Sequence, residues 1–310
     1  MLVRDRMDLE ELDARHARRE PTWLDLRDPD PAELEAVAGV LGLHSLALED
    51  SREFGQRPKL DRYPDQLLLV VYGLTMEPGG VPELVEVHVH VVDATVVTIS
   101  RRPPAQLDRV RRRLDGGDCS TGELVYRVID AVVDSLTEGL EVVADEVDAF
   151  ERTIFDHPRA RDRDRMAVLR RGLNGLRRTL AVQRQVWPRI VEQVVAISAD
   201  AEESRAYLAD VGDHLSQALD EIEADRESLQ GMLDTYSNEV QERLTIVATI
   251  FLPLTALTGF FGTNFQWMLD HIGSGWAFLV FGVGGTLVSC LAIVLWLRRT
   301  GLLDRTRPED

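Results

Sequence analysis

The sequence predicts an α+β cytoplasmic domain with long helices, which continues into an α-helical membrane domain of two transmembrane helices per subunit. Two stretches rich in Val, Ile and Thr, at residues 66–74 and 84–100, predict strands in the first third of the chain. From about Thr121, apolar residues recur at helical spacing. Near the end, the runs 244–268 and 272–297 contain no charged residue. Each run exceeds the roughly 20 apolar residues that a spanning helix needs.

Composition limits the function classes. The chain has 310 residues and a formal net charge of -18, which argues against nucleic-acid binding because that function needs a basic face. The charge is compatible with cation handling and equally with plain solubility. Cys119 and Cys290 are far apart and predict no disulfide. The segment Met1–Glu20 lacks the apolar core of a secretory signal, so we expect the N-terminal part in the cytoplasm.

The same patterns predict the domain boundaries. We expect a cytoplasmic α/β domain at 1–120, a long-helix domain and stalk at 121–243, a membrane part at 244–300 and a cytoplasmic tail at 301–310. The two transmembrane helices are expected at about 244–263 and 275–297, with a short outer loop between them. A buried soluble hairpin is the alternative, which two long apolar runs side by side disfavour.

The flanks of the membrane runs predict their orientation. Arg243 precedes the first run, and Arg298 and Arg299 follow the second, whereas the loop between the runs holds Asp270 and His271 but no Lys or Arg. By the positive-inside rule, both termini lie in the cytoplasm and the loop lies outside. The predicted location is the cell (inner) membrane, as a multi-pass protein.

The N-terminal domain is predicted to mix short helices with strands. Pro31 is tolerated in the first turn of a helix, and Pro78-Gly79-Gly80 predicts a turn between two strands. The predicted elements, in order, are a strand at Trp23–Leu26, helices at Asp30–Gly39 and Gly42–Asp50, and strands at Gln66–Leu74 and Leu84–Ser100.

Three long helical patterns follow. They cover Glu123–Phe155, Arg163–Ile197 and a segment that starts near Glu202 and continues into the first membrane run. Pro188 is expected to kink the second helix. Asp, Glu and Arg alternate along these helices, as on solvent-exposed or inter-subunit faces.

No catalytic or nucleotide-binding motif is found, so an enzyme is not expected. Gly282-Val283-Gly284-Gly285 lacks the Lys-Ser/Thr of a phosphate loop and favours close helix packing. His88 and His90 alternate along one strand, where a metal site is possible. A plain solvated strand face is the favoured interpretation of this pair.

The first membrane run carries a stripe of small or polar residues. Asn238, Gln241, Thr245, Ala248, Leu252, Thr255, Gly259 and Gly262 recur every three or four positions. Small residues let helices approach closely, so the stripe fits helix packing. It equally fits the lining of a water-filled path between symmetric copies. One helix per subunit cannot enclose a path, so a pore here requires an oligomer.

The segment Asn238–Phe265, NEVQERLTIVATIFLPLTALTGFFGTNF, resembles the signature of the CorA magnesium/divalent cation transporter family. In that two-transmembrane family, the first membrane helix ends in Gly-Met-Asn, where this chain has Gly262-Thr263-Asn264. Earlier segments are similar to the family's cytoplasmic domain: WLDLRDPDPAELE, GLHSLALED and QRPKLDRY. The approach to the membrane, RESLQGMLDTY, is similar too.

The resemblance implies a homopentamer with a CorA-like, funnel-shaped cytoplasmic domain, whose partners are its own copies, membrane lipid and divalent cations. The first membrane helices would line a pore and the second would form an outer ring. Leu244 would form a hydrophobic constriction and Asp234 would belong to a regulatory metal site. Gly262, Thr263 and Asn264 would form the selectivity filter, with Asn264 as the residue that meets the metal ion.

The implied activity is channel-type transport of Mg²⁺, with Co²⁺ or Ni²⁺ in many members, driven by the membrane potential and gated by cytoplasmic metal. Mg²⁺ would then be both the transported and the regulatory ion, and no nucleotide is expected. Two alternatives stay open: a Zn²⁺ transporter of the same fold, and a non-transporting membrane sensor or scaffold.

Overall fold

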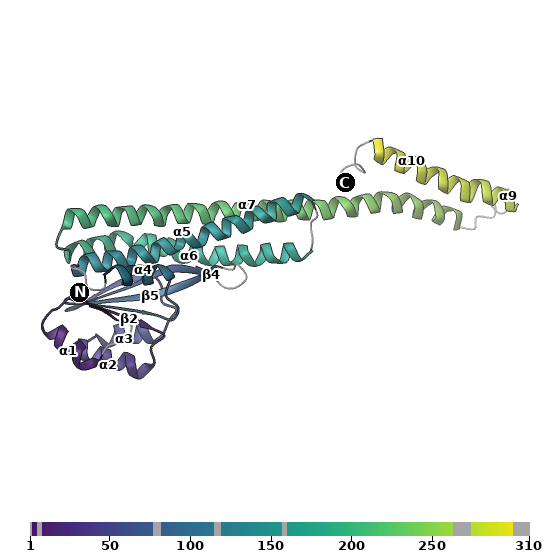
Figure 1. The fold of residues 1–310 in the computed structure, drawn as a ribbon. Helices are drawn as coiled ribbons and strands as arrows, with labels where there is room; N and C mark the ends of the chain where they lie inside the picture. The colour runs from purple at the N-terminus through teal and green to yellow at the C-terminus, as the bar shows by residue number, and fades with distance from the viewer. Residues whose placement is uncertain are drawn as a thin grey trace. The chain divides into compact units, whose positions relative to one another are not determined.

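The computed structural model describes residues 2–4, 8–76, 82–114, 119–156, 160–262 and 274–299 (Figure 1). The chain divides into two compact units. The first comprises Met1–Arg152 and Ala160–Gln230, and the second comprises Thr153–Arg159 and Gly231–Asp310. Each unit is described by itself.

The first unit is built on a six-stranded sheet in the order β1-β2-β6-β5-β4-β3. Strands β1, β2 and β6 are parallel, and β6, β5, β4 and β3 are antiparallel to their neighbours. The strands are β1 (Leu2–Arg4), β2 (Thr22–Arg27), β3 (Lys59–Tyr63), β4 (Gln66–Met76), β5 (Pro82–Val92) and β6 (Thr95–Ser100).

One strand prediction was wrong. The stretch Leu84–Ser100 forms two antiparallel strands, β5 and β6, because the chain reverses between Val92 and Thr95. Asp93 adopts a positive φ of 50° in this reversal. Asp tolerates this conformation better than most residues, so the turn forms without the Gly or Pro that marks most sharp turns in a sequence.

Three short helices cover one face of the sheet: α1 (Leu9–Ala17), α2 (Pro31–Leu41) and α3 (Ser45–Arg52) (Figure 1). Helix α2 begins as predicted, because Asp30 Oδ1 accepts the Glu33 backbone N–H at 2.8 Å. Gly42 ends this helix at φ 63° instead of starting the next one. The apolar layer under the helices contains Leu12, Leu24, Leu26, Leu34, Val37, Leu41, Val97 and Ile99.

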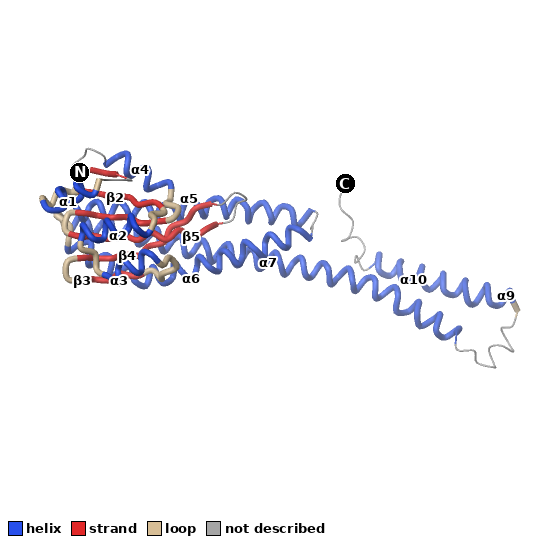
Figure 2. Tube along the Cα trace, turned by 90° about the horizontal axis from the view of Figure 1, so that it is seen from below, coloured by secondary structure: helices blue, strands red, loops and turns tan. Residues whose placement is uncertain are grey.

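The other face of the sheet packs against long helices (Figures 1 and 2). They are α5 (Thr121–Asp156) and α6 (Ala160–Ala196), with the short helix α4 (Ala105–Leu114) near β1. The first part of α7 (Ala201–Gly262) packs on α5 and α6. Gln183 of α6 bonds both backbone groups of Tyr72 on β4, at 2.6 and 3.2 Å. A Cβ at Gly73 would lie 2.7 Å from the Val132 carbonyl oxygen, so the close approach of α5 to β4 requires glycine there.

The second unit contains the rest of α7, followed by α9 (Gly275–Ala277), the π-helix η1 (Phe278–Gly284) and α10 (Gly285–Arg299). The chain is thus helical over the whole of the second predicted span. Among the described residues, one helix is long and apolar enough to cross a membrane, within Ala201–Phe260, and Leu279–Ile293 is a shorter apolar stretch. Gly282 is buried in η1, and Thr286 Oγ1 donates to its carbonyl at 2.7 Å.

Candidate functional site

The predicted pore-lining residues lie on one exposed side of α7, which we call the α7 stripe. At 3.6 residues per turn they fall within about a third of the helix circumference. The large apolar members, Leu244 and Leu252, are 65% and 75% exposed. The stripe consists of Asn238, Gln241, Leu244, Thr245, Ala248, Leu252, Thr255 and Gly259, and every one is exposed.

The half-buried residues of this segment lie on a different side of the helix. Ile246, Thr249, Ile250, Pro253 and Leu254 are half-buried. Their mean direction lies roughly 150° around the helix from that of the stripe. The stripe is therefore free for contact with something other than its own chain.

The threonines of this segment direct their protons into the helix. Thr245 Oγ1 donates to the Gln241 carbonyl at 2.8 Å, and Thr255 Oγ1 donates to the Phe251 carbonyl at the same distance. A hydroxyl has one proton and two lone pairs. With the proton used in the helix, the stripe threonines act toward a neighbour or a water molecule as acceptors.

Helix α7 is described as far as Gly262. The other predicted filter residues, Thr263 and Asn264, and the predicted outer loop lie outside the described residues. Asp234, predicted for a regulatory metal site, is an exposed residue of α7. Its role in metal binding stays a prediction.

The expectation of a solvated strand face at His88 and His90 was wrong. Both side chains are fully buried under α3, at 0% exposure. Ser51 Oγ of α3 lies 3.0 Å from His88 Nδ1 and 2.7 Å from His90 Nε2. The alternation of polar and apolar residues on a strand does not reveal that a helix covers the polar side.

The hydrogen bonds of this cluster have one direction. The His44 backbone N–H donates to Gln66 Oε1 at 2.8 Å, which leaves the Gln66 amide nitrogen to donate to His90 Nδ1 at 2.7 Å. His90 is then neutral and donates through Nε2 to Ser51. The chain continues through Ser51 to His88, whose Nε2 donates to Glu86 Oε1 at 2.6 Å.

Glu86 is the last acceptor in this series of hydrogen bonds, and it is a buried carboxylate. Burial alone would raise its pKa, but hydrogen bonds from His88, the Gly55 backbone and Tyr72 lower the pKa of Glu86 below its usual value. Burial, with a smaller contribution from His88, lowers the pKa of His90 to about 3. The cluster therefore holds one fixed negative charge and a neutral His90 at physiological pH.

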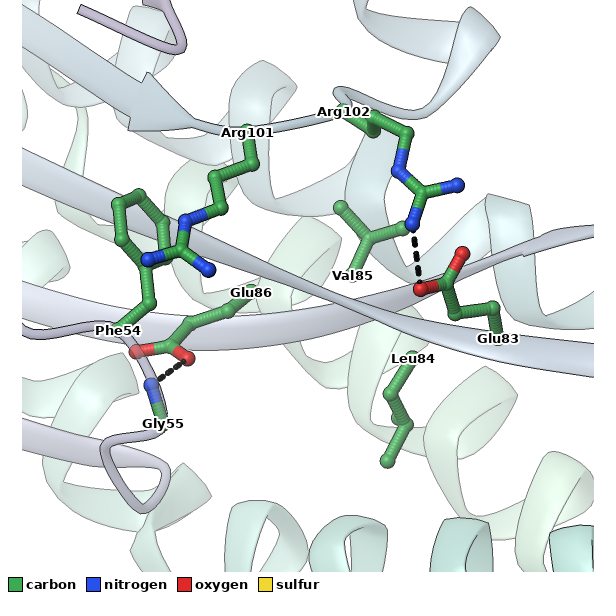
Figure 3. A pocket seen from close by; sticks show the side chains of 8 residues that line it. All are labelled: Phe54, Gly55, Glu83, Leu84, Val85, Glu86, Arg101 and Arg102. Atoms are coloured by element: carbon green, nitrogen blue, oxygen red, sulfur yellow. Dashed lines mark hydrogen bonds and ion pairs between the residues drawn. The ribbon is translucent and has the colours of Figure 1, made fainter. Parts of the chain in front are cut away.

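A cavity of about 330 Å³ adjoins this cluster (Figure 3). The Arg101 guanidinium lies 4.6 Å from the centre of the Phe54 ring. Arg102 Nη2 donates to Glu83 Oε1 at 2.7 Å, and Glu86 bonds the Gly55 backbone at 2.6 Å. Two arginines and two carboxylates balance the charge here. The lining residues are Phe54, Gly55, Glu83, Leu84, Val85, Glu86, Arg101 and Arg102.

Within the described part of a single chain, no group of three or more His, Cys, Asp and Glu side chains is placed to hold a metal ion. Sequence reasoning missed Ser51, Gln66 and Glu86 of the buried cluster. The available signal was that Glu86, His88 and His90 share one face of a strand whose other face is valine from Val85 to Val91. A strand of this kind is often covered on both faces.

Comparison with known proteins points to one family. The model of the CorA-like Mg²⁺ transporter protein family matches residues 19–299. The cobalt/magnesium transport protein CorA of Thermotoga maritima is 30% identical over 262 residues, which are 80% of this chain and 74% of that protein. The zinc transport protein ZntB of Yersinia pseudotuberculosis is 24% identical over 299 residues, covering 93% of this chain and 90% of that protein.

Solved structures share the fold. The complete structure of the CorA magnesium transporter from Methanocaldococcus jannaschii matches with a TM-score of 0.65 and 21% identity, over 90% of each chain. The full-length CmaX protein matches with a TM-score of 0.64 and 25% identity, over 89% of this chain and 88% of that one. A mixed α/β domain followed by long helices is thus the architecture of full-length relatives.

Proposed function

The chain belongs to the CorA family of Mg²⁺ transporters, and on this premise we propose that it forms a homopentameric channel for divalent cations, chiefly Mg²⁺. Membership makes it a metal-ion transporter of the membrane and not an enzyme. The observation that carries the finer proposal is the α7 stripe, in which every residue is exposed in the single chain. Around a symmetry axis, five such stripes would enclose a path.

The stripe has the chemistry of a path for a hydrated ion. Mg²⁺ releases its water reluctantly and prefers oxygen ligands. The waters around the ion donate hydrogen bonds, so a suitable lining consists of acceptors. Thr245 and Thr255 offer hydroxyl lone pairs, because their protons bond the Gln241 and Phe251 carbonyls. Rings of Asn238 and Asn264 side-chain carbonyls would extend this lining at the two ends.

Leu244 and Leu252 supply the closed state in this proposal. They are 65% and 75% exposed in the single chain, and rings of leucine around a narrow path exclude water and ions by dewetting. Acidic residues between subunits, with Asp234 as the family's position, would bind Mg²⁺ when the cytoplasm is replete. An ion that binds the closed state more tightly than the open state shifts the population of channels toward the closed state.

Inward flow needs no nucleotide. An inside-negative potential contributes about 2.3 kcal/mol per charge per 100 mV, or roughly 4.6 kcal/mol for a dication. In this proposal the protein lies in the cell (inner) membrane with both termini on the cytoplasmic side, as the distribution of arginines around the apolar runs predicts.

The ion is the least determined part of the proposal. The chain is similar both to a cobalt/magnesium transport protein and to a zinc transport protein, so Zn²⁺ transport is the second candidate. Reconstitution in liposomes tests both, by measuring Mg²⁺, Co²⁺ and Zn²⁺ entry under an inside-negative potential. Entry of Mg²⁺ supports the first candidate, entry of Zn²⁺ alone supports the second, and no flux of any ion indicates a sensor or scaffold.

A further inference from the structure

Charge is distributed unequally among the long helices of the first unit. Helix α6 contains nine arginines and three acidic residues. Its neighbour α5 contains ten acidic residues and two arginines. In a chain whose net charge is -18, helix α6 is a concentrated basic element.

Four exposed arginines of α6 are unpaired among the described residues. We call Arg163, Arg171, Arg178 and Arg184 the arginine row. All four are exposed, and none has a hydrogen-bond or ion-pair partner among the described residues. At 3.6 residues per turn, Arg171 and Arg178 face away from the buried side of α6, which carries Leu169, Leu173, Leu176 and Leu180, and the other two arginines flank that side.

Carboxylates face one another where α5 lies beside α7. We call this set the acidic seam: Asp130, Asp134, Glu141 and Asp148 of α5, and Asp210, Glu221 and Asp225 of α7. The helices meet here, since Tyr126 stacks on Tyr207 with ring centres 5.1 Å apart and His214 Nδ1 lies 3.7 Å from Asp134 Oδ1. The seam therefore places like charges across a helix contact.

The positive charges of the same chain do not balance the negative charge of the seam. Burial, and then the nearby Asp134, raises the pKa of Asp130 to about 6, although His214 and Arg127 oppose the shift. Farther along, burial raises the pKa of Asp225 to about 6, with further contributions from Glu221 and Asp148 and none from a cation. Asp225 is 9% exposed, and its Oδ2 has no hydrogen-bond partner in the described structure.

The row and the seam lie at the same heights along the helices. Helices α5 and α6 are antiparallel, and Arg165 Nη2 bonds Glu146 Oε1 at 2.6 Å. With a rise of about 1.5 Å per residue, Arg171 lies about 9 Å along α6 from this pair, which is the level of Glu141 on α5. Arg178 lies about 20 Å along, which is the level of Asp134.

This alignment is what a closed ring requires. Copies in a ring are related by rotation alone, and any slide along the axis would give an open helix instead. A rotation about an axis parallel to α7 moves a surface without changing its height. It can therefore bring the row of one copy against the seam of the next, in register over a length of about 30 Å.

We propose that the arginine row on α6 of one copy binds the acidic seam between α5 and α7 of the next copy, head to tail. The occupant of the seam is thus a second copy of this chain, chosen by complementary charge and matching height. The inference rests on the proposed homo-oligomeric channel and identifies one of its contact surfaces.

The test is the oligomeric state of full-length protein in detergent, measured by native mass spectrometry over a range of concentrations and salt. Arg171→Glu with Arg178→Glu should dissociate at a concentration at least tenfold higher than the unchanged protein. Arg57→Glu with Arg205→Glu makes the same charge change at exposed arginines outside α6 and should have little effect. Adding Asp134→Arg and Glu141→Arg to the row variant should restore assembly, which a merely misfolded variant would not show.

Two results would overturn the inference. One is a row variant that assembles like its control. The other is a seam that binds free Mg²⁺ in the assembled protein, lost on Asp225→Asn, while the row variant assembles normally. Failure of the proposed function looks different, because the unchanged protein would then be monomeric or would conduct no ion. If the unchanged protein is oligomeric and conducts ions, and the row variant assembles equally well, only this inference is wrong.

Discussion

His90 Nε2 lies 2.7 Å from Ser51 Oγ in the closed interior between α3 and the sheet. The same hydroxyl lies 3.0 Å from His88 Nδ1, so a single serine joins two fully buried imidazoles. This relationship fixes α3 on the sheet and determines how the N-terminal domain responds to mutation and pH.

Ser51→Ala should destabilise the domain. The change removes the group between two buried ring nitrogens, and an unsatisfied buried polar group costs about 1–3 kcal/mol. Thermal and denaturant unfolding of the full-length protein measure the loss. Ser45→Ala on the same helix is the matched control, because Ser45 is exposed. Equal stability of the two variants would mean that the buried chain of hydrogen bonds contributes nothing.

His90 should make the protein less stable as the pH is lowered below about 6.5, whereas Asp130 and Asp225, whose pKa values burial raises to about 6, act in the opposite direction. Burial lowers the pKa of His90 from 6.5 to about 3, so the unfolded chain binds a proton in this window that the folded chain excludes. The His90 contribution to the free energy of unfolding then decreases as pH falls toward 3. Glu86, whose pKa is lowered by its hydrogen bonds, acts in the same direction below 4.5. His90→Gln should lower the slope of stability against pH above pH 5, because it removes the His90 contribution.

Gly73→Ala should disturb the contact between β4 and α5. Its Cβ would lie 2.7 Å from the Val132 carbonyl oxygen and 2.4 Å from Ser135 Oγ. We expect a loss of about 1–3 kcal/mol, as for other overpacked interiors. Gly39→Ala is the control, since nothing lies within 4 Å of a Cβ there and Ala favours helix. A neutral Gly73→Ala would show that α5 can shift at little cost.

Asn264→Ala should abolish ion uptake and leave assembly intact. In the proposed mechanism, the Asn264 carbonyl accepts hydrogen bonds from the waters of the entering ion, and alanine cannot. Liposome uptake and native mass spectrometry are measured on the same preparation. Normal Mg²⁺ flux in this variant would remove Asn264 from the filter.

Leu244→Gly should make the closed channel leak. Removing the side chain widens and wets a constriction that closes by excluding water. Single-channel or liposome leak at high cytoplasmic Mg²⁺ is the measurement. Val247→Gly carries a similar helix penalty of about 1 kcal/mol, at a residue that is 51% exposed and outside the stripe. The gate assignment fails when the two variants leak equally.

Local signals in the sequence were enough for much of the fold. Asp30 and Pro31 predicted the start of α2, and uninterrupted helical spacing predicted that α7 continues into the first apolar run, as it does to Gly262. The reversal at Asp93 was missed because no Gly or Pro marks it in the sequence, and the positive φ is adopted by an aspartate. The burial of His88 and His90 was missed because it depends on α3, a helix distant in sequence.

The candidate site, too, could be predicted from the sequence only in part. Residue spacing placed the stripe on one side of α7, since a helix has a fixed period. Whether that side packs on a helix or lines a path depends on where other elements lie. The structure leaves the stripe exposed, and half-buried residues such as Ile250 and Pro253 lie on another side. The filter residues Thr263 and Asn264 lie outside the described residues and stay predictions.

The continuity of α7 has an electrical consequence. The peptide groups of one helix are aligned, so Ala201–Gly262 sums to a dipole whose C-terminal end carries about half a negative charge. In the proposed orientation, each copy points this end toward the outside. Parallel copies would then lower the electrostatic potential at the outer mouth, and cations would concentrate there before any side chain touches them.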